Sequence, residues 1–396
     1  MRLTILKNHS ADRAKCIVPI PYANSKPAVC RCIWGVHPTI APGWRAYYHD
    51  PLSSYGHFPT ESELASNGAA QAALHERAAD ATRSQFGKKV FVRAVVEVSN
   101  FCRENCGYCG MRRDNRNLTR YRAQYEQIAE LLVEHRPDSV TDVNIQSGED
   151  PVAMREVVLP LIETLRRETP LGISVCLGTL SPELYSELQA AGAGIFIMKF
   201  ESSDVAQYEQ LEAPGTLAER LRHIRLLAEN NWFVSSGFIV GLPGQVLRDL
   251  WKNLELARTL PLHGCSVSPF IPGENTPLAG SAMANADWTF NCVSALRLMR
   301  PDWVIPAVSA FNLAAQDGYR RGLRAGANLV TINLTPGNLR GDYVIYKRSR
   351  FIMTEERVLN ALSAEGLAPS KTGLEDFYRS QAADVAGKEI ASTVQR

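Results

Sequence analysis

The sequence contains no run of about 18 apolar residues, so no part of it is predicted to span a membrane as a helix. Residues 1–10 hold too short an apolar stretch for a secretory signal peptide. Neither sign of charge is in excess, because 43 basic and 41 acidic residues give a net charge of +2, and this balance implies no polyelectrolyte partner. These absences predict a cytoplasmic protein with no membrane or nucleic-acid partner.

Cysteine is present, but its pattern does not suit a disulfide scaffold. The nine cysteines are an odd number, and three of them form the run Cys102-x-x-x-Cys106-x-x-Cys109. A tight loop with this spacing can turn three sulfurs onto one small inorganic centre, and thiolates suit zinc or an iron–sulfur cluster. A structural zinc site usually takes four ligands, and no fourth cysteine or histidine lies nearby. A four-iron cluster held by three cysteines keeps one iron free to chelate a ligand; zinc and a plain electron-transfer cluster are the alternatives.

Residues 1–58 differ from the rest of the chain. They are rich in proline, tyrosine and tryptophan and lack a sustained helical or strand period, which predicts an irregular N-terminal extension. Within it, Cys30 and Cys32 with His37 could form a second metal site, but C-x-C is a weak pattern. Buried or free thiols are the commoner explanation, and no role follows for Cys16.

From residue 59 to 365, strand-like and helical patterns alternate, and a tail of residues 366–396 follows. Such alternation predicts parallel strands with crossover helices, and eight units predict a closed (β/α)₈ barrel of the TIM type. A doubly wound open sheet is the rival, but no Gly-rich dinucleotide fingerprint follows the first strand. The predicted strands are 90–98, 139–146, 171–178, 194–200, 232–240, 264–269, 302–307 and 327–333. The predicted helices include 60–86, 122–136, 153–168, 216–230, 246–259, 287–299 and 354–364.

Polar residues at the carboxyl ends of the strands are the candidates for chemistry, because active sites of such barrels lie there. After the second strand, the turn Ser147-Gly148-Glu149 offers a carboxylate that can accept hydrogen bonds from an amino group. After the fourth strand, Lys199 and Glu201 lie two apart and share one face, which fits cofactor contact and a buried ion pair equally well.

Two further features fall on predicted strands. The fifth strand and its loop are rich in glycine, so the backbone can approach a flat ligand such as adenine, and Ile239 offers it an apolar edge. Arg93 is a charge in the middle of an apolar strand, and a buried arginine is rarely without a partner. If the Arg93 side chain points into the barrel, it therefore needs a partner there: a carboxylate, the cluster region or an anionic substrate.

From about residue 61 to 365, the chain resembles the biotin-synthase-like branch of the radical S-adenosylmethionine (radical SAM) enzymes. It is most similar to the HydE-type [FeFe]-hydrogenase maturases. The matching stretches are specific and stand in family order: 93–122, 146–151, 241–245, 269–272 with 276–278, 305–307, 326–328 and 333–336.

The resemblance implies a [4Fe-4S] cluster on Cys102, Cys106 and Cys109, whose free iron would chelate S-adenosylmethionine. Reduction would cleave this cofactor to methionine and a 5′-deoxyadenosyl radical, which attacks a small substrate inside the barrel. By position, the residues implied to hold S-adenosylmethionine are Tyr108, Ser147, Gly148, Glu149, Glu201, Arg220 and Ile239. Those implied at the substrate are Arg93, Gln146, Ser309, Thr335 and Tyr346.

The sequence also departs from the family. The extension 1–58 matches nothing in it, Lys199-Phe200 stands where Arg-His is expected, and 341–348 diverges. Sulfur insertion normally needs a second cluster, and the remaining cysteines Cys176, Cys265 and Cys292 are too far apart in sequence to predict one.

The function that these observations favour is a maturase-type role on an iron–cysteine precursor of a metallocofactor. The alternatives are a mutase or lyase acting on a free amino acid, as in methylornithine synthesis, and a non-catalytic electron-transfer protein, which would not need the turn at residues 147–149. The expected partners are the small substrate and an external one-electron reductant such as flavodoxin or ferredoxin, and the expected protein is monomeric or weakly associating.

Overall fold

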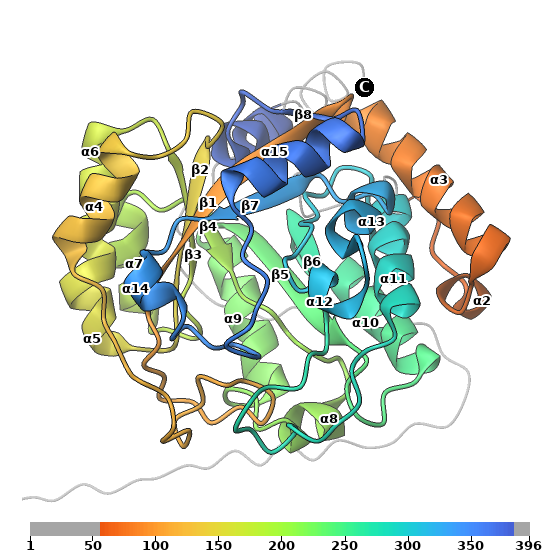
Figure 1. Ribbon diagram of the computed structural model, residues 1–396, viewed down its shortest axis with the longest axis horizontal. Helices are drawn as coiled ribbons and strands as arrows, with labels where there is room; N and C mark the ends of the chain where they lie inside the picture. Colours follow the sequence, from red (N-terminus) through yellow and green to blue (C-terminus); the bar gives the residue numbers. More distant parts are fainter. Residues whose placement is uncertain (1–55, 384–396) are drawn as a thin grey trace, which may run out of the picture. The chain divides into compact units, whose positions relative to one another are not determined.

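The computed structural model describes residues 56–383 (Figure 1). The predicted extension, with Cys16, Cys30, Cys32 and His37, lies outside these residues except for its last three. Among the helices of the described residues, none is long and apolar enough to cross a membrane.

A curled parallel sheet forms the centre of the fold, with the strand order β6-β5-β4-β3-β2-β1-β7. The predicted α/β barrel is thereby confirmed, and Figure 1 shows the helices arranged around the outside of the sheet. The strands of this path are β1 Lys89–Ser99, β2 Asp142–Ser147, β3 Gly172–Cys176, β4 Ile195–Ile197, β5 Phe233–Val240, β6 Gly264–Pro269 and β7 Leu329–Asn333.

The predicted strand 302–307 is the one that does not form a ladder. It makes two isolated parallel bridges, Val304 with Gly264 of β6 and Pro306 with Leu329 of β7, and so continues the ring between these strands. Pro306 has no amide hydrogen to donate, which limits regular pairing at this point. A short strand that sequence reasoning missed, β8 Ala368–Pro369, pairs with the start of β1 and lies in the segment expected to be a tail.

Most predicted helices are present with small shifts of their ends. The predicted helix 60–86 is divided, because α2 ends at Leu64 and a new helix begins after Asn67. The helices are α2 Glu61–Leu64, α3 Gly68–Phe86, α4 Tyr125–Glu134, α5 Pro151–Ala153, a π-helical turn Met154–Val158, α6 Leu159–Glu168, α7 Pro182–Ala191, α8 Val205–Gln210, α9 Leu217–Glu229, α10 Leu247–Thr259, α11 Ala286–Met299, α12 Phe311–Ala314, α13 Gly318–Arg324, α14 Gly337–Arg340 and α15 Glu355–Ala364.

Side chains on β1 alternate between two environments, as a strand with helices on its outer face requires. Val90, Val92, Ala94, Val96 and Val98 belong to the main hydrophobic core. Phe91 belongs instead to a small apolar cluster that closes the amino-terminal end of the barrel, together with Ile195, Phe233, Val304, Leu329, Leu374 and Tyr378.

Residues 366–383 contribute to this barrel floor. The Leu374 amide donates to both carboxylate oxygens of Asp142, at 3.0 Å each, and Leu374 is buried beside Tyr378. Because the floor is closed, access to the barrel interior is left to the carboxyl ends of the strands.

Candidate active site

A cavity of about 370 Å³ fills the barrel interior and extends from the floor to the loops at the carboxyl ends of the strands. Eleven of the fifteen predicted site residues border it: Arg93, Cys106, Tyr108, Cys109, Gln146, Ser147, Glu201, Arg220, Ile239, Ser309 and Tyr346. Cys102, Gly148, Glu149 and Thr335 lie just behind this wall and contact residues near it. The barrel therefore brings together positions that are up to 253 residues apart, counting from Arg93 to Tyr346.

The cysteine loop follows β1 directly and is held in shape mainly by polar contacts to its own backbone. The Arg120 guanidinium donates to four loop carbonyls, those of Asn100, Met111, Arg112 and Asn115. At the other side, the Gly107 amide donates to the Leu211 carbonyl at 2.7 Å. Arg120 is thus a structural residue of the cysteine loop.

Burial raises the pKa of each of the three cysteine thiols, in the case of Cys109 to about 12. Without a metal, thiols in this environment therefore keep their protons. A metal centre would displace those protons, because the thiolate is the form that binds iron or zinc.

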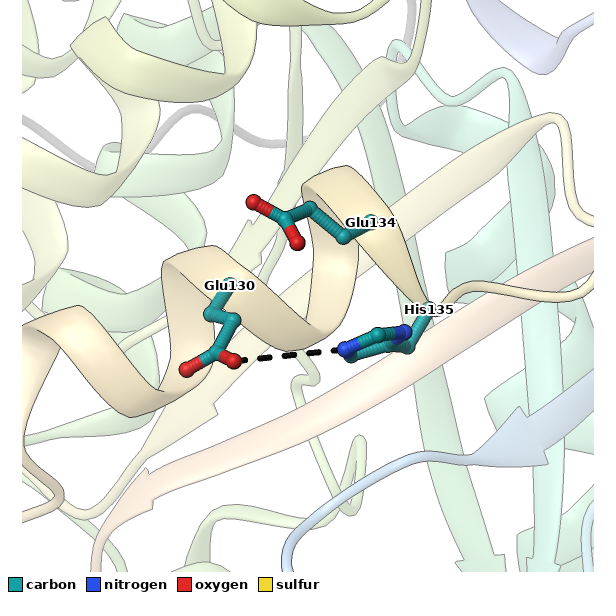
Figure 2. A group of neighbouring side chains, drawn as sticks. All are labelled: Glu130, Glu134 and His135. Carbon is teal, nitrogen blue, oxygen red and sulfur yellow. Dashed lines mark ion pairs between the residues drawn. The ribbon is translucent and has the colours of Figure 1, made fainter.

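A single metal ion does not fit the cysteine loop. Within residues 56–383, three ligand atoms within 4.8 Å of one another occur only at Glu130, Glu134 and His135, which are exposed at the end of α4 and do not border the cavity. Figure 2 shows Glu130 and His135 pointing toward one another. A tetrahedral zinc ion with bonds of about 2.3 Å would hold its sulfurs about 3.8 Å apart, which the three cysteines do not meet. A cluster that binds each thiolate to a different iron allows a wider spacing.

The turn after β2 rests directly on the cysteine loop. A Cβ atom on Gly148 would lie 2.2 Å from the Phe101 carbonyl oxygen and 2.7 Å from Cys102 Cβ, so this contact requires glycine. The Gly148 amide donates to the Ser99 carbonyl at 3.1 Å, and the Arg103 amide donates to the Glu149 carbonyl at 3.1 Å. The loop and the turn therefore form one rigid cradle.

Thr179 connects two of the predicted cofactor residues, and sequence reasoning missed it. Its amide donates to Glu149 Oε1 at 2.8 Å, and its hydroxyl accepts from Arg220 at 2.9 Å. Burial raises the pKa of Glu149, against the opposing effect of this amide and of Arg220. Nothing in the local sequence distinguishes Thr179 from an ordinary loop residue; its position three residues after β3 is the only signal.

Glu201 lies on the opposite side of the cradle in a strained backbone conformation. Its φ of 61° falls in the left-handed region, which is uncommon for a residue with a side chain and clusters at functional sites. The Tyr108 hydroxyl donates to Glu201 Oε1 at 3.3 Å. This bond joins the cysteine loop to the segment that follows β4. Burial raises the pKa of Glu201, while Lys199 and Arg220 act in the opposite direction.

Lys199 does not form the ion pair that the sequence had left open. Its ammonium donates to Ser268 Oγ at 3.0 Å, and within residues 56–383 no carboxylate oxygen lies within 4.0 Å of it. Arg93 is similar, because Nε donates to Thr331 Oγ1 at 3.2 Å while the two terminal nitrogens have no hydrogen-bond partner among the described residues. Both cations border the cavity.

Glu97 makes the most side-chain hydrogen bonds of the site, and sequence reasoning missed it, because its only local signal is a charge within an apolar strand. It is 1% exposed and pairs with both terminal nitrogens of Arg350, one of them at 2.6 Å. It also accepts from Asn333 at 3.1 Å, from the Thr335 hydroxyl at 3.1 Å and from Gln146 at 3.4 Å. Thr335 therefore acts on Glu97 and does not border the cavity itself.

Comparisons with known proteins agree with this geometry. Residues 96–257 match the radical SAM superfamily. The [FeFe] hydrogenase maturase subunit HydE of Thermotoga maritima is 33% identical over 277 residues, which are 69% of this chain and 78% of that protein. The 3-methylornithine synthase of Methanosarcina acetivorans is 26% identical over 292 residues, 72% of this chain and 81% of that protein. Biotin synthases are also among the relatives.

A solved structure shows the same fold. The crystal structure of methylornithine synthase (PylB) matches with a TM-score of 0.71 and 21% identity, covering 86% of this chain and 99% of that chain. The similarity to the maturase subunit extends over more than two thirds of both proteins. The chain therefore belongs to the radical SAM superfamily, in its biotin-synthase-like branch, and is an enzyme that uses a [4Fe-4S] cluster and S-adenosylmethionine.

Proposed function

We propose that Cys102, Cys106 and Cys109 hold the [4Fe-4S] cluster and that S-adenosylmethionine lies on the turn at residues 147–149. The close packing of Gly148 against Cys102 supports this assignment, because it sets the turn beside the proposed cluster ligands. With both groups bound and one electron from an external reductant, this site would supply a 5′-deoxyadenosyl radical by reductive cleavage of S-adenosylmethionine.

The residues around the cradle supply the contacts that this cofactor needs. The Glu149 carboxylate accepts hydrogen bonds from the amino group of S-adenosylmethionine. Glu201, which accepts from Tyr108, offers acceptors for the ribose hydroxyl groups of the cofactor. Arg220 keeps Glu149 oriented through Thr179, and Ile239 gives an apolar surface for adenine. The closed floor and surrounding core keep water away from the reacting atoms.

The substrate is proposed to be a small molecule that carries a carboxylate. The observation behind this proposal is Arg93, which lines the cavity and whose terminal nitrogens have no hydrogen-bond partner among residues 56–383. A buried guanidinium needs an anion, and a carboxylate accepts two parallel hydrogen bonds from it. Gln146, Ser309 and Tyr346 border the same cavity and provide neutral polar contacts.

The role that fits best is maturase-type: attack on an iron–cysteine precursor of the hydrogenase cluster, whose cysteine carries the required carboxylate. The 33% identity to the HydE maturase subunit supports this choice. The second candidate is a mutase or lyase acting on a free amino acid, which carries the same carboxylate. The 26% identity to 3-methylornithine synthase over 72% of the chain favours that candidate.

Release of 5′-deoxyadenosine by reconstituted, dithionite-reduced protein tests the two candidates. The assay compares no substrate, an iron–cysteine carbonyl–cyanide complex and a panel of free amino acids. Stimulation by the iron complex alone is the expected result. Stimulation by one amino acid would replace the maturase role with the biosynthetic one, and no release under any condition would refute the radical function.

A further inference from the structure

One cysteine borders the cavity without a place in the proposed function. Cys176 is the last residue of β3 and pairs in register with Gln146 of β2. It lines the cavity, whereas the other two cysteines described outside the cysteine loop, Cys265 and Cys292, are fully buried in the core at 0% exposure. Its thiol is therefore the one, among residues 56–383 outside that loop, that a substrate can reach.

Cys176 lies directly beneath the cofactor cradle. Two residues further on, a Cβ at Gly178 would lie 2.1 Å from Glu149 Cγ, and the next residue, Thr179, bonds to both Glu149 and Arg220. Alternate residues of an extended chain are about 7 Å apart. The thiol is thus about one such step below the residues proposed to hold S-adenosylmethionine, on the side where the substrate must lie.

Of the charges that act on this thiol, the cations Lys199 and Arg93 have the largest effects. Arg93 and Lys199 border the same cavity, and within residues 56–383 neither has a carboxylate oxygen within 4.0 Å. Burial raises the pKa of Cys176, and the opposing effects of Lys199 and Arg93 do not reverse this. The sulfur therefore keeps its hydrogen at neutral pH, beside charges that would hold the anionic groups of a substrate.

We propose that Cys176 is a catalytic residue whose S–H group gives a hydrogen atom to the substrate radical. The proposal rests on the proposed radical function. The S–H bond breaks as the C–H bond of the product forms, and a sulfur radical remains on Cys176. One electron from the external reductant and one proton from solvent restore the thiol. Each product then consumes one S-adenosylmethionine and two electrons, one for cofactor cleavage and one for the thiol.

The step is physically reasonable because an S–H bond is weaker than an aliphatic C–H bond. Transfer of the hydrogen atom from Cys176 to an aliphatic carbon radical beside it is therefore energetically favourable. Without such a donor, the radical would have to take its hydrogen back from 5′-deoxyadenosine, and the product would carry no hydrogen from solvent. The two routes differ in where the new hydrogen comes from, which an isotope can distinguish.

The position of the thiol is tested without turnover. Because iodoacetate and iodoacetamide attack the thiolate, cluster-loaded protein is treated anaerobically with either reagent over a pH series from 7 to 10, and labelling of Cys176 and Cys292 across the series is compared by peptide mass spectrometry. We expect labelling at Cys176 and none at Cys292, with iodoacetate favoured several-fold because its carboxylate is drawn to the two cations. Lys199→Met should reduce this preference. Equal protection of both cysteines would overturn the proposal, because the thiol would then not face the cavity.

The hydrogen transfer is tested in D₂O, with the iron–cysteine complex or the amino acid that stimulates 5′-deoxyadenosine release. Thiols exchange with solvent, so the wild-type product should carry one solvent deuterium. Cys176→Ser should release 5′-deoxyadenosine with far less product per molecule released, and any product should lack that deuterium, whereas the core variant Cys292→Ser should match wild type.

The outcomes separate the two proposals. Wild-type product without solvent deuterium would overturn the role of Cys176 and leave the proposed function intact. Absence of 5′-deoxyadenosine with every compound would overturn the proposed function, and the role of Cys176 with it.

Discussion

The ion pair between Glu97 and Arg350 offers the sharpest test of how the cavity wall is held. Glu97 is 1% exposed and the Arg350 side chain 13% exposed, so both charges are largely removed from water. Arg350→Met leaves the carboxylate with neutral donors only, those of Asn333, Thr335 and Gln146. Removing one partner of a buried ion pair typically costs about 3–5 kcal/mol. Because three neutral donors remain, we expect Arg350→Met to lower the free energy of unfolding by about 3 kcal/mol.

The second half of the test also removes the charge of Glu97. In the double variant Glu97→Gln with Arg350→Met, no buried carboxylate is left unpaired, so we expect at least half of the lost stability to return. Urea unfolding of wild type, both single variants and the double variant gives the coupling free energy, expected at about 2 kcal/mol. Additive effects of the two single variants would refute the reasoning, because the pair would then not be energetically coupled.

Three further predictions concern the cluster, the substrate and the floor. Cys106→Ala should abolish both cluster absorbance and cleavage of S-adenosylmethionine, whereas Cys292→Ala in the core should keep both; retained cleavage in Cys106→Ala would contradict the loop assignment. Arg93→Met should keep uncoupled cleavage and lower substrate kcat/KM by about 10- to 100-fold, the value of a charge-assisted hydrogen bond of about 1.5–3 kcal/mol; equal loss of both activities would make Arg93 structural. Burial raises the pKa of Asp142 from 3.8 to about 6, so its contribution to stability is present at low pH and is lost as pH rises through 6, by up to about 3 kcal/mol. Urea unfolding between pH 4 and 7 should therefore show a smaller decline for Asp142→Asn than for wild type, and parallel curves would exclude the buried titration.

The parts of the site that could be predicted are those written in local sequence. The cysteine spacing, the turn after β2 and the strand that carries Arg93 each lie within a few residues, and the barrel places them at one cavity as expected. The missed contacts join distant positions. Arg350 meets Glu97 across 253 residues, and no periodicity or spacing can predict that pair.

The strand predicted at 302–307, which forms no ladder, has a different cause. Residues 302–307 have the apolar composition of a strand, but Pro306 cannot donate to a ladder, and only two bridges form. The floor was missed because 366–383 was expected to be a tail, although Leu374 and Tyr378, four residues apart on one helical face, are buried there. In both cases tertiary contacts, and not local propensity, decide the structure.

Two of the departures from the family pattern, Lys199 and the segment 341–348, border the same cavity. Lys199 replaces an expected arginine and binds Ser268 of β6. In the divergent segment 341–348, the Ile345 carbonyl accepts from Gly110 of the cysteine loop at 2.9 Å, and the Tyr346 carbonyl accepts from Glu274 at 2.7 Å. This segment therefore forms a wall that is anchored to the cysteine loop and borders the substrate space.

The cofactor cradle, by contrast, keeps the residues that the family resemblance requires. A fold can keep one chemistry and redirect it by changing the residues that meet the substrate. The changed residues here keep a cation at position 199 but replace the expected guanidinium with an ammonium, and the divergent segment 341–348 lines the same cavity through Tyr343, Ile345 and Tyr346. For that reason the substrate assay must contain amino acids beside the iron complex: under the proposed function the cradle sets how the radical is made, and we expect Lys199 and the segment 341–348 to set which molecule the radical meets.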